Sequence, residues 1–259
     1  MSRTKIVVMA CIAVVVLAAV VAVKLVFFPS VKDAYFAMNS GSLQRVPANL
    51  VIIRPTHFPN SVRKGLFYGN SQRNGQNVQR MMGRDVTFRD LIAAAYGQND
   101  SRISLPPDAP TNNYDFLVTV NADPEEHLKT GIRKKLGYTA DMETHDADVL
   151  DLKVEDSSLP GLTVSPPGEK QNGDVRNGRL YFTHMKLGDL MGGVEQMLKM
   201  PVVDKTGLTN FYDFSLVFNP QVQRGQLDRA GIEKIIGDWG LGLEPDIAQM
   251  EMLVVKRVH

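Results

Sequence analysis

The sequence predicts an α+β protein: an N-terminal transmembrane helix followed by two related lobes, each a small, mainly antiparallel sheet with helices packed on one face. Three observations lead to this prediction. An apolar run without charged residues begins at Ile6. In the rest of the chain, short β-branched runs alternate with stretches of helical periodicity. The stretch Leu180 to Phe218 repeats an order of motifs that first appears at Val86.

The N-terminal run has the properties of an uncleaved signal anchor. Residues 6–23 carry no charge and approach the roughly 20 residues that a helix needs to cross a bilayer. Basic residues precede the run, which orients the N-terminus toward the cytoplasm. We therefore expect a single-pass cell membrane protein that contacts lipid through residues 6–28. The bulk of the chain would lie in the periplasm or the extracellular space.

Two other processing routes fit the N-terminus less well. A cleavable signal peptide has a shorter apolar region followed by small residues at its cleavage site. A lipoprotein would be acylated at Cys11, but the apolar run continues beyond this residue.

Composition excludes several classes of protein. Without the basic residues of its first 30 positions, the chain has a net charge of about −2, which argues against a nucleic-acid surface. Cys11 is the only cysteine, so the part after the anchor can form neither an internal disulfide nor a thiolate metal site. Its core must be held by packing alone.

The order of motifs predicts five segments. They are residues 1–29, a cytoplasmic tip and transmembrane anchor; 30–47, a stalk; 48–156, a first α+β lobe; 157–177, a linker; and 178–259, a second α+β lobe. The linker is rich in Ser, Pro and Gly and has no hydrophobic period.

The first lobe contains the weaker copy of the repeat. Its helix buries one face through an apolar period, begins with a capping box of Thr87 and Asp90, and ends at Gly97. Alternating residues then predict a strand over 114–120 with one face inward. A polar stretch, Asn60 to Gln79, predicts an exposed loop, and its basic residues could contact an anion or a lipid headgroup. These residues are Arg63, Lys64, Arg73 and Arg80.

The second copy contains the strongest helical period, from Leu187 to Leu198, which Pro201 ends. Each copy closes with a short helix and two further strands. In the first copy these strands are Tyr138 to Glu143 and Asp148 to Val154, which we interpret as a hairpin. Residues 241–258 repeat this arrangement.

These residues resemble a soil-associated family of uncharacterised bacterial extracytoplasmic proteins. The similarity lies in a strand that ends in Arg-Pro, a VTFRDLIAAAY helix, and a PVVDKTGLTNFYDF turn and strand. Here these motifs are Val51 to Pro55, Val86 to Tyr96, and Pro201 to Phe214. The resemblance implies an anchored or exported domain with a sensing or interaction role, and it brings no established activity.

Only one group of side chains suggests a metal site. Asp141, Glu143 and His145 alternate along a predicted strand, so they share one face and could converge on a cation, with Asp146 and Asp148 nearby. The matching residues 246–251 keep two acids and no histidine, which favours a solvated edge. We therefore assign no metal site, no cofactor and no catalytic residue.

Three further patterns have structural explanations. Asp115 and Asp213 occupy equivalent positions beside aromatic residues and suggest paired carboxylates, but Asp at the start of a strand commonly bonds backbone N–H groups. Gly237 to Gly242 follows a helix instead of opening one, which suits a helix end better than a phosphate loop. Six methionines could bind copper, but packing is their expected use. They are Met185, Met191, Met197, Met200, Met250 and Met252.

We therefore expect a protein-binding or assembly module without catalytic activity. Its partner would be another envelope protein or a second copy, joined through an exposed sheet edge or a helix groove. One alternative is an accessory or sensor subunit of a larger membrane complex. Another is a metal-dependent hydrolase centred on Asp141, Glu143 and His145.

Overall fold

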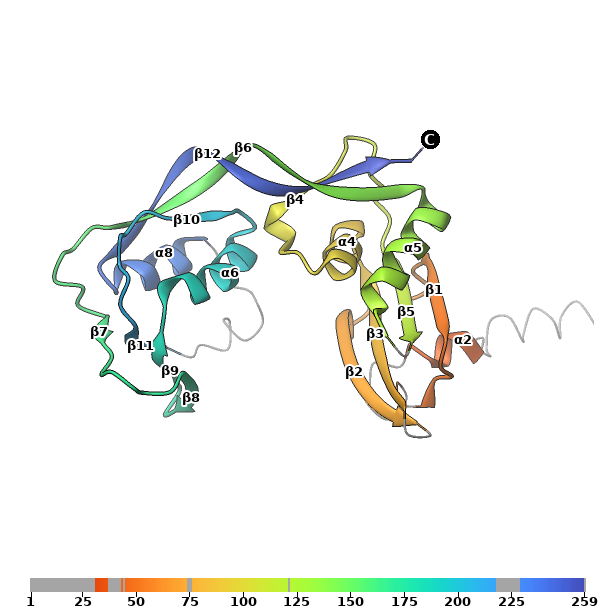
Figure 1. Cartoon of the computed structure of the whole chain (residues 1–259), viewed down its shortest axis with the longest axis horizontal. Helices are drawn as coiled ribbons and strands as arrows, with labels where there is room; N and C mark the ends of the chain where they lie inside the picture. Colours follow the sequence, from red (N-terminus) through yellow and green to blue (C-terminus); the bar gives the residue numbers. More distant parts are fainter. Residues whose placement is uncertain are drawn as a thin grey trace, which may run out of the picture. The chain divides into compact units, whose positions relative to one another are not determined.

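The chain forms two compact units in a computed structural model, which describes residues 31–36, 43, 45–73, 76–120, 122–217 and 229–258. The described residues of unit 1 lie within Met1–Ala95 and Pro110–Leu136, and those of unit 2 within Tyr96–Ala109 and Gly137–His259. The architecture is α+β with mainly antiparallel sheets, as the sequence predicts (Figure 1). The division differs from the predicted break at residues 157–177, because the chain enters unit 2 twice.

Unit 1 is built on one antiparallel sheet with the strand order β1-β5-β3-β2. Its strands are β1 (Leu50–Pro55), β2 (Gly65–Arg73), β3 (Gln76–Val86) and β5 (Tyr114–Val120). The predicted loop over 60–79 is wrong, since most of it forms the β2–β3 hairpin. Composition was misleading there because backbone pairing requires no apolar side chains on a strand at the sheet edge.

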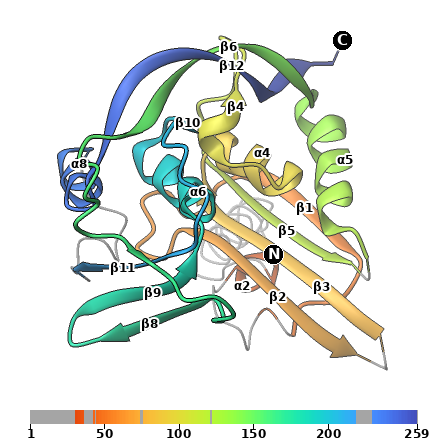
Figure 2. The ribbon, with the colours of Figure 1, turned by 60° about the vertical axis from the view of Figure 1, so that its left-hand side comes forward.

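Helices α4 (Phe88–Tyr96) and α5 (Pro124–Leu136) follow β3 and β5. Thr87 and Asp90 form the predicted capping box, in which each side chain accepts a bond from the other residue's backbone N–H. Helix α5 lies on β1 and β5 (Figure 2). The approach is close at Gly131, where a Cβ atom would lie 2.8 Å from Ile53 Cδ1.

The opposite face of this sheet is covered by the segment before β1, which includes α2 (Val31–Ala34). Phe36, Leu43 and Val46 are buried there against Met82 and Leu117. The described residues of the predicted stalk therefore pack on unit 1. The apolar residues of this segment are few but bulky, and they cover the second face of the sheet. All seven residues of β5 are therefore buried, whereas the sequence predicted burial of one face.

Unit 2 contains two four-stranded sheets, ordered β10-β6-β12-β4 and β7-β11-β9-β8. The strands of the first are β4 (Ile103–Ser104), β6 (Tyr138–Val154), β10 (Val202–Asp204) and β12 (Leu241–Arg257). Those of the second are β7 (Thr163–Val164), β8 (Asn172–Arg176), β9 (Arg179–Met185) and β11 (Tyr212–Val217). The described helical elements of the unit are η1 (Asp100–Arg102), α6 (Leu187–Leu198) and α8 (Arg229–Gly237).

Strands β6 and β12 form one long antiparallel ribbon, which Figures 1 and 2 show as a continuous twisted pair. They pair over all 17 residues, from Tyr138↔Arg257 to Val154↔Leu241. The predicted hairpin within residues 138–154 is therefore wrong. This stretch contains no Gly, Pro or Asn to form a tight turn, so the strand continues.

In each half of the sequence, a short strand that follows a helix pairs with a long strand of the other half. Strand β10 follows α6 but pairs in parallel with β6, and β4 follows α4 but pairs in parallel with β12. The orders β1-β5-β3-β2 and β7-β11-β9-β8 also match position by position along the chain. This crossing explains the unit boundaries, because β4 carries residues of the first half into unit 2.

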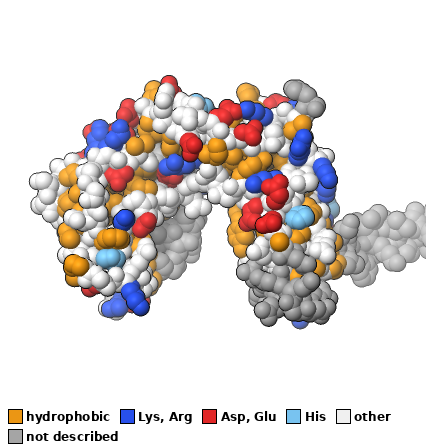
Figure 3. Space-filling view, viewed as in Figure 1, with side chains coloured by type: hydrophobic (Ala, Val, Ile, Leu, Met, Phe, Trp, Pro, Cys, Tyr) orange, Lys and Arg blue, Asp and Glu red, His pale blue; other side chains and the backbone are white. Residues whose placement is uncertain are grey.

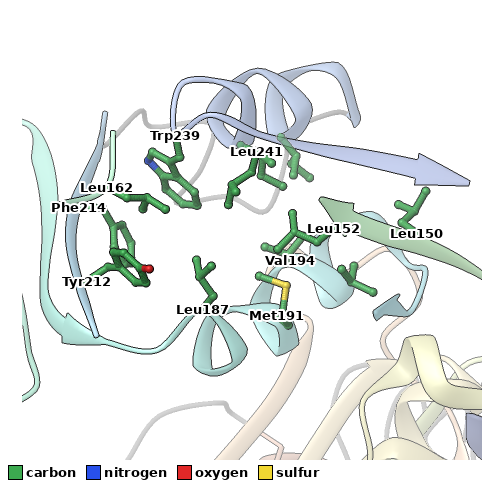
Figure 4. Close-up of a cluster of buried hydrophobic side chains, with 13 residues drawn as sticks. Leu150, Leu152, Leu162, Leu187, Met191, Val194, Tyr212, Phe214, Trp239 and Leu241 are labelled. Atoms are coloured by element: carbon green, nitrogen blue, oxygen red, sulfur yellow. The ribbon is translucent and has the colours of Figure 1, made fainter. Parts of the chain in front are cut away.

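The core of unit 2 combines residues from both halves (Figure 4). Leu187, Met191 and Val194 of α6 lie with Phe214 and Trp239, while β6 contributes Leu150 and Leu152. The chain leaves α6 at Lys199 in a left-handed conformation (φ 57°), just before Pro201.

Candidate functional site

Asp115 is a fully buried carboxylate that ties together the end of β1 and a bulge in β3. Its Oδ1 accepts hydrogen bonds from Thr56 Oγ1 (2.8 Å) and from the backbone N–H of Asp85 (3.1 Å). Its Oδ2 accepts bonds from the backbone N–H of His57 (2.9 Å) and from Arg54 Nε (3.3 Å). Such a saturated acceptor stabilises a turn and holds no vacant position for a substrate.

Asp213 makes the corresponding contacts in unit 2. Its Oδ1 accepts bonds from Ser165 Oγ (2.5 Å) and from the backbone N–H of His184 (2.9 Å). His184 has a positive φ of 55°, as Asp85 does at 52°. Both aspartates thus hold a turn by accepting backbone N–H groups, which is the role that the sequence predicted for them.

Arg102 and Glu195 form an ion pair that sequence patterns did not indicate. Arg102 donates from Nε (3.1 Å) and Nη2 (2.5 Å) to the carboxylate of Glu195, which is 2% exposed. The backbone N–H of Val202 donates to the same carboxylate (2.9 Å). The pair connects η1 to α6 beside the crossing strands, so its role is to hold the two halves of the sequence together.

The predicted metal group lies on β6, with all three side chains on one face of a single strand. Glu143 is engaged by Lys256 of β12 in an ion pair, and Lys256 has a raised pKa, mainly because of this hydrogen bond. Asp141 and His145 are exposed. Among the described residues, no three His, Cys, Asp or Glu side chains are placed to hold one metal ion.

The middle of the β6–β12 ribbon is exposed and acidic, and acidic side chains are visible along it in the space-filling view (Figure 3). We define the central ribbon as residues 141–148 of β6 and 244–251 of β12. None of these residues is buried, and together they include seven acids and no Lys or Arg. The acids are Asp141, Glu143, Asp146, Asp148, Glu244, Asp246 and Glu251.

The outer edge of β6 presents unpaired backbone groups along the central ribbon. The N–H of Leu150 donates to the carbonyl of Pro201, and the carbonyl of Leu152 accepts from the N–H of Lys205. The backbone N–H and C=O groups of even-numbered residues of β6 therefore point away from β12. Ala140 agrees, since its N–H donates to Tyr96 Oη (2.9 Å). Between these contacts, outward backbone groups belong to Met142, Thr144, Asp146 and Asp148. Within the described ranges they have no hydrogen-bond partner.

The outer edge of β12 is interrupted opposite Asp148 and Leu150, whereas Gln249 and Glu251, opposite Asp146 and Thr144, keep outward backbone groups. The backbone N–H and C=O groups of its odd-numbered residues point away from β6, on the side of the strand where β4 pairs. Pro245 has no N–H to offer, and the N–H of Ile247 donates to Asp246 Oδ1 (2.8 Å). The two edges of the ribbon therefore differ: β6 offers donors and acceptors, while β12 has lost two consecutive outward donors.

Lysines flank one end of the central ribbon. Lys153 contacts Glu244 (2.5 Å) and lies 3.8 Å from the buried carboxylate of Asp151, which Lys205 approaches to 3.9 Å. The pKa of Asp246 is lowered, mainly because its carboxylate accepts the N–H of Ile247. The charges of Lys205 and Lys153 lower this pKa further.

The other predicted contact residues are dispersed. Arg80 is buried and donates to the carbonyl of Val46 (2.8 Å), whereas Arg63 and Lys64 are exposed, and the side chain of Arg73 lies outside the described residues. Of the six methionines that the sequence analysis expected to pack, Met191 and Met252 are buried. Gly237 ends α8, as predicted for the glycine-rich stretch.

Comparison with known proteins assigns the chain to a family. The family model described as "Protein of unknown function (DUF3738)" matches residues 89–258, well over half of the chain. The chain belongs to this family. The DUF3738 match includes both long strands and the whole central ribbon, and it agrees with the uncharacterised family expected from the motifs. No curated protein and no solved structure matches the chain.

The predicted transmembrane segment, residues 6–28, lies outside the described residues. Within the described ranges, no helix combines the length and apolar character needed to cross a membrane. The open edge of β6 was missed from sequence because backbone groups leave no residue signature. The available signal was a run of 17 residues without Gly, Pro or Asn, with acids concentrated at its centre.

Proposed function

We propose that this DUF3738 protein is a membrane-anchored, extracytoplasmic protein-binding or assembly module that works without catalytic residues. The observation that carries the proposal is the exposed central ribbon. Among the described residues, the strand partners on the outer sides of its two long strands are three residues of β10 and two of β4. An uncovered strand edge binds another chain through its backbone groups and needs no reactive side chain.

The environment of two buried acids, Asp115 and Glu195, supports a role without catalysis. Asp115 and Glu195 accept several hydrogen bonds that join distant segments. A catalytic carboxylate needs a free oxygen within reach of a substrate. These two carboxylates are engaged in stabilising the fold.

The docked N-terminal segment supports the anchoring part of the proposal. Asp33 pairs with Arg54 of β1 at 2.5 Å, and Phe36 lies under the same arginine, 4.7 Å from its guanidinium carbon. Since the proposed span ends at Phe28, this contact would hold unit 1 close to the membrane surface. The bulk of the chain would then lie in the periplasm or extracellular space, with the N-terminus in the cytoplasm.

We also propose that the chain is an internal duplication whose halves have exchanged strands. The matching strand orders of two sheets and the reciprocal crossing of β4 and β10 support this history. Exchange makes each half incomplete alone, since each contributes a strand to the other's sheet.

Capture of the full chain from cross-linked native membranes tests the proposed function. The chain should be recovered from the membrane fraction after alkaline extraction, together with one distinct envelope protein or a second copy at fixed stoichiometry. Recovery of the chain alone and monomeric, or its release by alkali, would contradict the proposal.

A further inference from the structure

We propose that the open edge of β6, from Met142 to Asp148, binds an extended cationic segment of a partner protein as an added strand. This inference rests on the proposed binding function and names its site and partner chemistry. The edge spans seven residues, about 23 Å at 3.3 Å per residue. Strand addition there would extend the β10-β6-β12-β4 sheet next to the three-residue β10.

The backbone supplies the affinity. Four outward residues each offer one N–H and one C=O, and the described residues satisfy none of these groups. The edge is also bounded at both ends: Tyr96 Oη takes the N–H of Ala140, and Pro201 takes the N–H of Leu150. An added strand of about seven residues therefore fits between two fixed points.

The negative charge along β6 indicates which kind of segment would bind to its open edge. Side chains of Thr144, Asp146 and Asp148 share one face of β6, where cross-strand neighbours of an added strand would lie. Within the part of the chain that the structure describes, neither Asp146 nor Asp148 has an ion-pair partner. Like charges directly opposite one another are unfavourable, so the acidic ribbon disfavours a second copy of itself. It favours a strand with Lys or Arg at alternate positions.

The other edge of the ribbon provides an internal control. On β12, Pro245 and the capped N–H of Ile247 interrupt the row of donors, although the acidic character is shared. Charge alone would not distinguish the two edges, whereas strand addition favours β6, whose row of outward donors is uninterrupted from Met142 to Asp148.

A synthetic decapeptide of alternating Lys and Val tests the proposal with the full chain in detergent. Its N-methylated analogue keeps the charge but loses the donors on one edge, and a Glu-Val decapeptide reverses the charge. We expect saturable binding of the Lys-Val peptide, slower amide hydrogen exchange at Thr144 and Asp146, and at least tenfold weaker binding of both control peptides.

Two matched proline variants locate the binding edge. Thr144→Pro removes an outward N–H from β6, and Gln249→Pro removes one from β12 at an equally exposed position of the same ribbon. Thr144→Pro should weaken peptide binding at least tenfold, and Gln249→Pro less than twofold. The double variant Asp146→Asn/Asp148→Asn, which leaves the backbone unchanged, should weaken binding severalfold and reduce its salt dependence.

Equal effects of the two proline variants would overturn the proposal, as would equal binding of the N-methylated peptide. Self-association of the chain without peptide binding would overturn it as well. These outcomes are separate from a failure of the proposed function. If membrane capture yields a partner that Thr144→Pro does not release, the edge is the wrong site and the binding function stands.

Discussion

Arg102 and Glu195 lie 93 positions apart in sequence and form a two-pronged ion pair in unit 2. The carboxylate is buried, and the arginine side chain is one-third exposed (33%). Because one partner belongs to the first half of the chain and the other to α6, the pair joins the crossing strands.

Removing the arginine should therefore destabilise the protein. Arg102→Ala leaves a buried carboxylate without its cation, and we expect a loss of about 2–3 kcal/mol in the free energy of unfolding, after allowing for the arginine's exposure. Urea unfolding measures this loss. The exposed pair of Lys234 and Asp238 is the control, since Lys234→Ala should cost less than about 0.5 kcal/mol. Equal costs for the two variants would refute the assigned role.

The two turn-holding aspartates should differ in importance. Asp115→Asn places an amide NH₂ among four donors around a fully buried position, so we expect a cost of about 3 kcal/mol or more. Asp213→Asn affects a half-buried group with two donors on one oxygen and should cost about 1–2 kcal/mol. Thermal unfolding of both variants gives the comparison, and a larger loss for Asp213→Asn would be inconsistent with this geometry.

Alanine substitutions at two glycines should change the stability of the protein in opposite directions. A Cβ atom at Gly83 would lie 2.2 Å from Phe116 Cε1, so Gly83→Ala should destabilise unit 1 by about 1–3 kcal/mol. Gly193 of α6 has open space around it, and Gly193→Ala should stabilise by up to about 1 kcal/mol through its helix propensity. Denaturant midpoints report both changes. Similar shifts of the same sign would show that the β3–β5 packing is misassigned.

The carboxyl of Asp246 should titrate below its ordinary range. Because its pKa is lower in the folded than in the unfolded state, ionised Asp246 favours folding above the unfolded pKa, near 3.9. That contribution is lost as the pH falls through the folded pKa. Carboxyl NMR titration should give a depressed pKa that rises in the Lys205→Ala variant. A pKa that stays at the ordinary value would argue against the hydrogen bond from Ile247.

Local features of the fold were predictable from sequence because they depend on neighbouring residues. The capping box at Thr87, the end of α4 at Gly97 and the stop before Pro201 follow from backbone chemistry within a few positions. Mainly antiparallel sheets followed from alternation and short turns.

Long-range features were not predictable in the same way. Residues 138–154 show two apolar ends with an acidic centre, which resembles a hairpin when considered alone. Only pairing with residues 241–257 makes the stretch one strand. The burial of Phe36 and the Arg102–Glu195 pair likewise depend on partners far along the chain, for which a single sequence carries no local signal.

Amide hydrogen exchange along β6 tests the central claim most directly, namely that a continuous ribbon offers one open edge. The backbone N–H of His145 points toward β12 within the sheet, and that of its neighbour Thr144 points away from β12. We predict slow exchange at Glu143, His145 and Ala147 and fast exchange at Thr144 and Asp146. Uniformly fast exchange across residues 143–147, as a hairpin turn would show, would contradict the account.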